Sequence, residues 1–395
     1  MILVGDCLDA LRAMPSESVD AVVTDPPYGL GKPPPAADVL RAWLDGATYR
    51  ATGGGFMGAS WDAFVPGPEV WREVARVLKP GGHAVIFAGS RTLDWMGISV
   101  RLGGLEIRDT LGWVYWSGFP KSLDVSKAIP ATDAARQWSG WGTALKPAIE
   151  PAILARKPLA GTVAANVQRH GTGAINVDGC RLVPGDLAWP GPAEVESNYT
   201  TGSDARSLGF HHGVNTAKDH PLSVRYSAAG RWPANLYACA KASRAERERG
   251  CDGLPARSGA DAVHREEGSA GMQSPRAGAG RKREEVRNHH PTVKPIRLMR
   301  WLCRLVTPPG GLVVDPFAGS GSTGVAAVLE GFDFTGCELD EGHAAIARAR
   351  IGHAKTSPGE WGDTAPGGKR KKAAKVAKVR KVKVKAESHP TLFGW

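Results

Sequence analysis

The chain has 395 residues and a formal net charge of +11; 42% of its residues are hydrophobic and 23% are charged. This composition is that of a globular protein and excludes a fibrous or wholly disordered chain. No apolar run reaches the roughly 18 residues that a transmembrane helix needs, so we expect no membrane span. The six cysteines include no CxxC pair, which excludes a zinc knuckle and favours a reducing, cytoplasmic setting.

The first part of the chain predicts alternating strands and helices. Residues 19–24 and 83–88 are short apolar runs typical of buried strands. Residues 69–78 have helical spacing, and the Lys-Pro-Gly-Gly sequence at 79–82 is expected to end that helix. Residues 105–116 are expected to hold a further strand or hairpin. Strands that alternate with helices indicate a mostly parallel sheet.

A long middle region, residues 157–288, has a different composition. It is rich in Gly, Ser, Asn and Arg and has little periodicity, and only residues 232–237 within it suggest a strand. A stretch of this length without regular structure is unusual in a compact domain unless it is functional. We therefore interpret it as an inserted recognition region.

The alternating pattern returns in the last third of the chain. Helices are predicted at 295–306, 323–330 and 341–351, and strands at 312–316 and 332–337. The order strand, helix, strand, helix is that of a doubly wound α/β fold.

A glycine-rich loop follows the strand predicted at 312–316. Gly319, Gly321 and Gly324 match the GxGxxG pattern between a strand and a helix, and Glu338 lies 19 residues after the first glycine. Such glycines let the backbone approach a nucleoside ligand, and the acid can accept hydrogen bonds from ribose hydroxyls. A kinase-type phosphate loop is excluded, because no Gly-Lys-Ser/Thr follows. Asp315 beside the loop disfavours a pyrophosphate and favours a cationic ligand such as S-adenosylmethionine.

A second motif, Asp25-Pro26-Pro27-Tyr28, follows the strand predicted at 19–24. Ligands of open α/β sheets bind at the carboxyl ends of strands. The two prolines stiffen the turn, which fixes the Asp25 carboxylate and the Pro26 carbonyl as two acceptors. Tyr28 adds a flat aromatic face. The motif therefore predicts a receptor for a planar ring that carries an NH2 group.

Together these motifs resemble those of the amino-methylating DNA methyltransferases, in the permuted β-type arrangement found also in phage and prophage members. The resemblance covers about 1–130 and 285–352 and is carried by four segments: 5–11, 24–29, 290–295 and 315–321. It implies a circularly permuted, Rossmann-like α/β fold with an inserted target-recognition region. It also implies methyl transfer from S-adenosylmethionine to the N6 amine of adenine in double-stranded DNA, with base flipping.

The resemblance also implies roles for individual residues. Asp25 and the Pro26 carbonyl would accept the two amine hydrogens, Pro27 would stiffen the turn and Tyr28 would stack on the base. A second stacking wall is expected among Trp113, Trp116 and Phe119, with core packing for at least two of them. The expected cofactor-binding residues are Asp6 for the adenosine part, Thr292 and Lys294 for the methionine carboxylate, Asp315, Phe317, Gly319 and Gly321 around the ligand, and Glu338 for the ribose.

Four segments follow from this reading. Residues 1–156 are the catalytic half, 157–288 the target-recognition region, 289–355 the cofactor-binding half and 356–395 a linker with a basic tail. Double-stranded DNA is the expected partner; no obligate protein partner is implied. Two histidine pairs lack flanking cysteine or carboxylate clusters, so we expect polar loop residues and no metal site at 211–212 and 289–290.

Other functions remain open from the residues alone. N4-cytosine methylation is the nearest alternative, although its enzymes more often carry Ser where Asp25 stands. An RNA or planar-amide methyltransferase, a catalytically inactive DNA-binding module and an NAD-dependent dehydrogenase are further alternatives. The intact acidic motif argues against the inactive module. The recognition sequence and the oligomeric state cannot be predicted.

The net charge is concentrated in the tail. Residues 369–385 contain ten Lys or Arg and no acid, and without those ten the chain has 40 basic against 39 acidic residues. Such a block repels itself and is typical of a disordered segment that contacts nucleic acid phosphates. The basicity therefore predicts a separable contact and not the chemistry of the folded part.

Truncation after Gly368 tests this prediction. Loss of the tail should weaken affinity for DNA and flatten its salt dependence, because fewer counterions are released on binding. Methyl transfer and site preference should be unchanged. The measurement is the dissociation constant of full-length and truncated protein across a salt series; an unchanged slope would mean that the tail makes no phosphate contacts.

Overall fold

One eight-stranded sheet, in the order β1-β10-β9-β2-β3-β5-β4-β6, organises the computed structural model of the chain. The structure describes residues 1–51, 54–55, 60–118, 122–130, 133–182, 186, 188, 232–258 and 285–362. The strands of the sheet are β1 (Ile2–Val4), β2 (Val19–Thr24), β3 (Leu78–Phe87), β4 (Glu106–Val114), β5 (Ile149–Arg156), β6 (Leu236–Ala238), β9 (Leu312–Asp315) and β10 (Asp333–Glu338). Two short strands, β7 (Arg257–Ser258) and β8 (Glu285–Val286), form a separate antiparallel pair.

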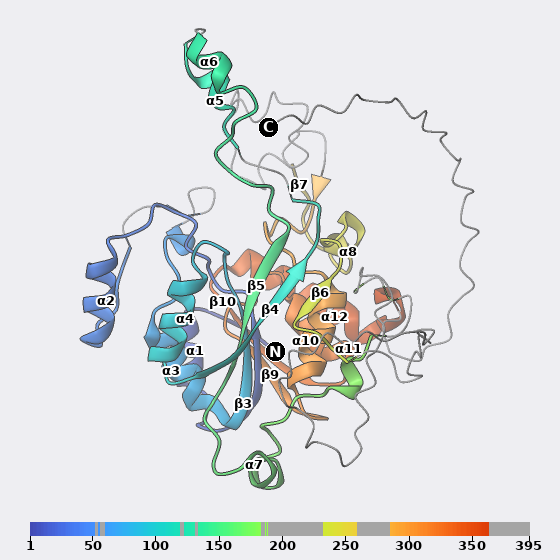
Figure 1. Cartoon of the computed structure of the whole chain (residues 1–395). Coiled ribbons are helices and arrows are strands. Elements are labelled where there is room, and N and C mark those ends of the chain that lie inside the picture. Colours follow the sequence, from blue (N-terminus) through green and yellow to red (C-terminus); the bar gives the residue numbers. More distant parts are fainter. Residues whose placement is uncertain are drawn as a thin grey trace, which may run out of the picture.

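Helices cover both faces of this sheet, with α1, α3 and α4 on one side and α10, α11 and α12 on the other (Figure 1). They are α1 (Cys7–Arg12), α2 (Ala36–Leu44), α3 (Pro68–Val77), α4 (Leu93–Leu102), α5 (Val125–Ala128), α6 (Asp133–Gln137), α7 (Val163–His170), α8 (Arg244–Glu248), α10 (Ile296–Val306), α11 (Ser322–Leu329) and α12 (Glu341–Thr356), with short 3-10 turns at η2 (Ser60–Asp62), η3 (Asp178–Cys180) and η6 (Pro358–Trp361). The α/β layers confirm the expected Rossmann-like class.

Alternating side chains of the central strands supply two separate cores. On β3, Val85 and Phe87 face the core formed with α10, α11 and α12. Ala84 and Ile86 face the core formed with α3 and α4. Because neighbouring residues of a strand point to opposite faces, an unbroken apolar strand buries both of its sides. This explains why the runs predicted as buried strands contain almost no polar residues.

The two parts of the chain meet at the parallel pair β2 and β9. Ala21 lies opposite Val313 in this pair and Val22 opposite Val314. β9 also pairs in parallel with β10, and β2 with β3, so the glycine-loop strand lies in the middle of the sheet. The predicted mostly parallel sheet is confirmed; only β5 runs against its neighbours.

Two elements differ from the expectation. β3 begins at Leu78, five residues before the predicted strand, because the Lys-Pro-Gly-Gly segment enters the sheet through a register irregularity beside Val19. β5 was not predicted at all; Pro151 lies within it, and proline argues against a strand in a sequence reading.

Part of the middle region joins the folded body. β6 pairs with the edge of β4, and α7 packs near β3. The predicted strand at 232–237 overlaps β6 by two residues. The histidines at 211–212 and the basic tail lie outside the described residues. Among the helices that the structure describes, none is both long and apolar enough to cross a membrane.

Asp20 provides a test of the junction between the two halves. Its carboxylate accepts a hydrogen bond from the Leu312 backbone N–H at 2.8 Å and one from the Lys79 ammonium at 2.6 Å. Asp20→Ala should lower the free energy of unfolding by about 1–3 kcal/mol, because a buried donor loses its acceptor. Urea denaturation measures this change.

Asp20→Asn keeps an acceptor for the Leu312 N–H and should cost less than the alanine variant. Asp333→Ala, on an exposed residue of β10, is the matched control and should be nearly neutral. Equal stability of Asp20→Ala and the wild type would contradict the role of Asp20.

Candidate active site

The Asp25–Tyr28 turn is held in place by a buried carboxylate from another part of the chain. Asp62, which is 2% exposed, accepts hydrogen bonds from the backbone N–H groups of Tyr28 at 2.7 Å and Gly29 at 2.9 Å. The Thr92 hydroxyl donates to the Tyr28 carbonyl at 2.6 Å. The turn is therefore fixed by protein contacts before any ligand binds.

Charged side chains from distant segments gather around Asp25. The Tyr28 hydroxyl donates to Asp25 Oδ1 at 2.7 Å, and the Lys294 ammonium donates to Oδ2 at 2.5 Å. Glu150 of β5 lies 3.3 Å from the Lys294 nitrogen and 3.4 Å from the Tyr28 hydroxyl. Lys241 approaches the other oxygen of Glu150 at 3.5 Å. Two carboxylates and two ammonium groups thus share one pocket with a phenol.

The protonation states of this cluster follow from burial and mutual attraction. Burial raises the pKa of Asp25, and the Lys294 ammonium opposes that rise. Burial would lower the pKa of Lys294, but the two carboxylates beside it raise that pKa overall, so the amine keeps its proton. Burial would raise the pKa of Glu150, yet the two lysines hold it below its usual value. Burial raises the pKa of Tyr28 well above normal, so its hydroxyl remains a donor.

Aromatic rings line the same pocket. The Lys294 nitrogen lies 4.9 Å from the centre of the Phe87 ring and 5.4 Å from that of Tyr28, and the Lys241 nitrogen lies 4.1 Å from the Tyr115 ring. Cations over aromatic faces are favourable contacts, and flat rings can equally accept a planar base.

Of the three residues expected as a stacking wall, Trp113 is buried in the core and donates its indole N–H to the Cys239 carbonyl at 3.0 Å. Trp116 is exposed, and Phe119 lies outside the described residues.

The glycine loop lies next to this pocket, across the β2–β9 pair. The Thr24 hydroxyl, one residue before Asp25, donates to Asp315 Oδ1 at 2.6 Å. Gly319 and Gly321 have φ angles of +51° and +75°, which L side chains rarely adopt. Glu338 accepts the Gly319 backbone N–H at 2.7 Å and so ties the loop to the end of β10.

A buried arginine supports the loop from behind. Arg350 of α12 has no exposed surface, and its Nη1 donates to the Ser320 carbonyl at 2.7 Å and to the Ser322 hydroxyl at 3.3 Å. Burial lowers the pKa of this guanidinium to about 10, which leaves it charged at neutral pH. The loop conformation therefore depends on α12 as well as on its own glycines.

The remaining predicted residues lie around the same edge of the sheet. Asp6 caps α1 by accepting the Leu8 N–H at 2.8 Å, just after β1 pairs with β10. The Phe317 N–H donates to Asp315 at 3.1 Å. The Thr292 N–H donates to His290 Nδ1 at 3.3 Å. The structure thus brings both motifs to one edge, while Lys294 contacts Asp25 directly.

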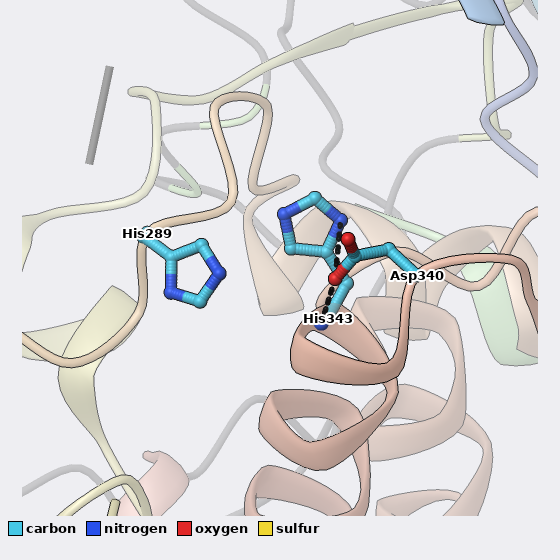
Figure 2. A group of neighbouring side chains, drawn as sticks. All are labelled: His289, Asp340 and His343. Carbon is cyan, nitrogen blue, oxygen red and sulfur yellow. Dashed lines mark hydrogen bonds and ion pairs between the residues drawn. The ribbon is translucent and has the colours of Figure 1, made fainter. Parts of the chain in front are cut away.

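Figure 2 shows a second polar cluster beside the glycine loop, formed by His289, Asp340 and His343. One possible ligand atom of each residue lies within 4.8 Å of the others, so a carboxylate does flank the 289–290 histidine pair. Asp340 Oδ1 accepts the His343 backbone N–H at 2.8 Å and caps α12. This capping accounts for the position of Asp340 without an ion.

A protein-family model described as a DNA methylase of the N6/N4 type matches residues 19–349. The chain belongs to this family. It is therefore a DNA methyltransferase, and its cofactor is S-adenosylmethionine.

Individual relatives of this methyltransferase cover different shares of the chain. The putative methylase YubD of Escherichia coli K12 is 44% identical over 63 residues, which is 16% of this chain and 28% of that protein. The type II methyltransferase M.HindIII of Haemophilus influenzae is 22% identical over 379 residues, 89% of this chain and 95% of that protein.

Among solved structures, the methyltransferase is similar to TTHA0409 of Thermus thermophilus, a DNA modification methylase by its description. The identity is 20%, the coverage is 91% of this chain and 95% of that one, and the TM-score is 0.42. The cytosine-N4-specific PvuII DNA methyltransferase is 16% identical, with coverage of 89% and 85% and a TM-score of 0.45.

Three residues of the methyltransferase site were not found by sequence reasoning. Glu150 belongs to the unpredicted strand β5. Asp62 acts on a turn 34 residues earlier in the chain, and no local motif marks it. Arg350 stands on a helix where an arginine ordinarily faces solvent. A strand prediction at 149–156 would have brought Glu150 to the pocket edge; the other two leave no signal in one sequence.

Asp315 gives the methyltransferase a specific pH dependence. Burial raises the pKa of its carboxyl from 3.8 to about 6, although the Thr24 hydroxyl partly opposes the rise. The folded state thus binds this proton more tightly than the unfolded chain. The contribution of Asp315 to the unfolding free energy therefore falls as pH rises from 3.8 to about 6.

Asp315→Asn retains the shape and one acceptor oxygen but cannot titrate. The fall in unfolding free energy over this window should be smaller in the variant, by about 2–3 kcal/mol. Urea denaturation of both proteins at several pH values across the window measures the difference. Parallel curves would show that Asp315 is not protonated in the folded state.

Proposed function

We propose that the protein transfers the methyl group of S-adenosylmethionine to the N6 amine of adenine in double-stranded DNA. The observation that carries the proposal is the position of Asp25. Its carboxylate is fixed at the end of β2, next to the strand that ends in the glycine loop. The choice of adenine over cytosine rests on the aspartate in this motif, where N4-cytosine enzymes more often have serine.

The glycine loop and its surroundings fit the cofactor. Glu338 presents a carboxylate at the end of β10, although both of its oxygens also accept backbone N–H groups, from Gly319 at 2.7 Å and Asp340 at 3.0 Å. Each oxygen retains a second lone pair for a ribose hydroxyl. Asp315 and Asp6 would lie beside the ligand, where acidic groups suit a sulfonium cation. When bound, S-adenosylmethionine supplies an electrophilic methyl group.

Asp25 and Pro26 would prepare the amine for this electrophile. The lone pair of an exocyclic adenine nitrogen is delocalised into the ring, so the amine is a weak nucleophile. Two acceptors fixed out of the ring plane would pyramidalise the nitrogen and direct its lone pair toward the methyl group. This is catalysis by orientation and preorganised charge.

Lys294 stands where the amine would bind. Its ammonium donates to Asp25 Oδ2 at 2.5 Å, so this oxygen can accept from a nitrogen donor, and the lysine must leave it when the amine takes its place. Glu150, at 3.3 Å, is an anion already in contact with Lys294 and can retain the ammonium. Lys294 would thereby keep Asp25 ionised without competing for it during transfer.

The DNA must present a single base to this pocket. An amine inside a stacked pair cannot reach a carboxylate at the sheet edge, so the base is expected to flip out and stack on Tyr28. We propose that residues 157–288 read the target sequence around it. The work of the enzyme would take place on cytoplasmic DNA, without an obligate protein partner.

Labelled S-adenosylmethionine and duplex DNA test the function. The purified protein should transfer label, and digestion should yield N6-methyladenine. Asp25→Ala should reduce transfer at least about 100-fold, because an oriented acceptor for the amine is lost. Liquid chromatography of the digested nucleosides identifies the product.

Cofactor binding separates the possible roles of Asp25. Calorimetry should show nearly unchanged S-adenosylmethionine affinity in Asp25→Ala, and Asp9→Ala on exposed α1 is the matched carboxylate control for activity. Recovery of N4-methylcytosine would replace adenine by cytosine in the proposal. Loss of cofactor binding in Asp25→Ala would move this residue to the cofactor site.

A further inference from the structure

The connection between β4 and β5 forms an arm, residues 115–148, that carries α5 and α6 far beyond the sheet (Figure 1). β5 is antiparallel to both β3 and β4, so β4 runs in the same direction as β2 and β3. The arm therefore leaves from the edge of the sheet where the strand before Asp25 ends. It projects on the side that a DNA substrate must approach.

Both ends of the arm are rooted in the active site. Tyr115, whose ring lies under the Lys241 ammonium, begins the arm, and its N–H donates to the Ala148 carbonyl at 3.0 Å. Glu150, two residues after the arm ends, contacts Lys294. A Cβ added to Gly118 would collide with the Pro147 carbonyl, which shows how closely the two legs pack.

The described part of the arm has regular contacts at its tip. Asp124 forms an isolated β-bridge with Gly142, and the Val125 N–H donates to the Trp141 carbonyl at 3.1 Å. The Leu123 N–H donates to the Thr143 hydroxyl at 3.0 Å. These contacts fix the spacing of α5 and α6 and present their side chains in a defined orientation.

Large apolar side chains on the arm face solvent. Trp138 and Trp141 are 44% and 60% exposed, and their rings meet edge to face at 5.2 Å. Trp116 near the root is 62% exposed and has a φ of +57°, a conformation that is strained for a bulky residue. Such strain concentrates at functional sites. Exposed aromatic rings on a projecting element are typical of a binding surface.

The charge of the arm favours a stacking contact over phosphate binding. Lys127 pairs with Asp124 at 3.0 Å, and Arg136 pairs with Asp133, so most of the described basic groups have acidic partners. Aromatic faces stack on bases of any sequence. A duplex that has released one base offers unstacked neighbours and a gap in the helix, and apolar wedges commonly fill such openings.

We propose that Trp138 and Trp141 pack against the DNA around the extruded base and stabilise the flipped state. The occupant is the target duplex, because the base can enter the pocket only if the duplex lies over the edge from which the arm projects. This inference rests on the proposed methylation of a flipped base, and it assigns a DNA contact outside the 157–288 region.

The test is the double variant Trp138→Ala/Trp141→Ala, assayed on two duplexes that contain the site methylated by the wild type. In one duplex the target base is paired; in the other it faces an abasic position. We expect about a tenfold or larger loss of single-turnover methylation on the paired duplex, in line with the energy of stacking one or two bases. On the abasic duplex, where flipping costs less, the variant should be close to the wild type.

Leu44→Ala, which removes an exposed apolar side chain from α2, is the control and should behave like the wild type on both duplexes. Fluorescence anisotropy with the same duplexes measures binding without transfer, and the loss of affinity should be similar at low and high salt. Equal losses on the two duplexes, no loss on either, or conversion of a dimer to a monomer in the double variant would each overturn the proposal. A wild type that methylates no duplex would contradict the proposed function, while the binding comparison would still decide the role of the arm.

Discussion

The pairing of β2 with β9 is the contact on which the site depends. β2 ends in the Asp25 turn and β9 ends in the glycine loop, and the two strands lie side by side although about 290 residues separate them. Their backbone register places Thr24 beside Asp315, whose hydrogen bond is buried. A one-residue slip would turn every side chain of one strand to the opposite face. The distance between amine receptor and cofactor loop is therefore set by strand register and not by flexible segments.

Long-range polar contacts then fix the groups that this register brings together. Asp62 holds the catalytic turn, Arg350 holds the glycine loop, and Lys294 links Asp25 to Glu150. Each is a buried or half-buried charge with specific partners, and such groups are expensive to bury unless they are paired. Their presence in one small region shows that the fold sacrifices some stability for a preformed arrangement of acceptors.

Local chemistry explains what could be predicted from sequence. The Asp-Pro-Pro-Tyr turn and the glycine loop each carry their function within a few consecutive residues, and the apolar runs before them read as strands. Lys294 was expected at the cofactor, but its bond to Asp25 spans 269 positions and becomes visible only in the folded chain. Glu150 was missed because Pro151 concealed its strand. Arg350 was missed because its burial depends on Trp361, whose ring lies 5.7 Å from the guanidinium.

The separation of β2 from β9 also has a consequence for synthesis of the chain. The catalytic turn leaves the ribosome early, but the strand that completes its side of the sheet follows only after Leu312 has been made. Until then one edge of β2 has no partner, and unpaired apolar edges invite association with other chains. Contacts of such long sequence separation also form slowly. A nascent or truncated chain therefore contains the complete amine receptor and yet has no cofactor loop beside it, so methylation begins only when the last third of the protein has folded.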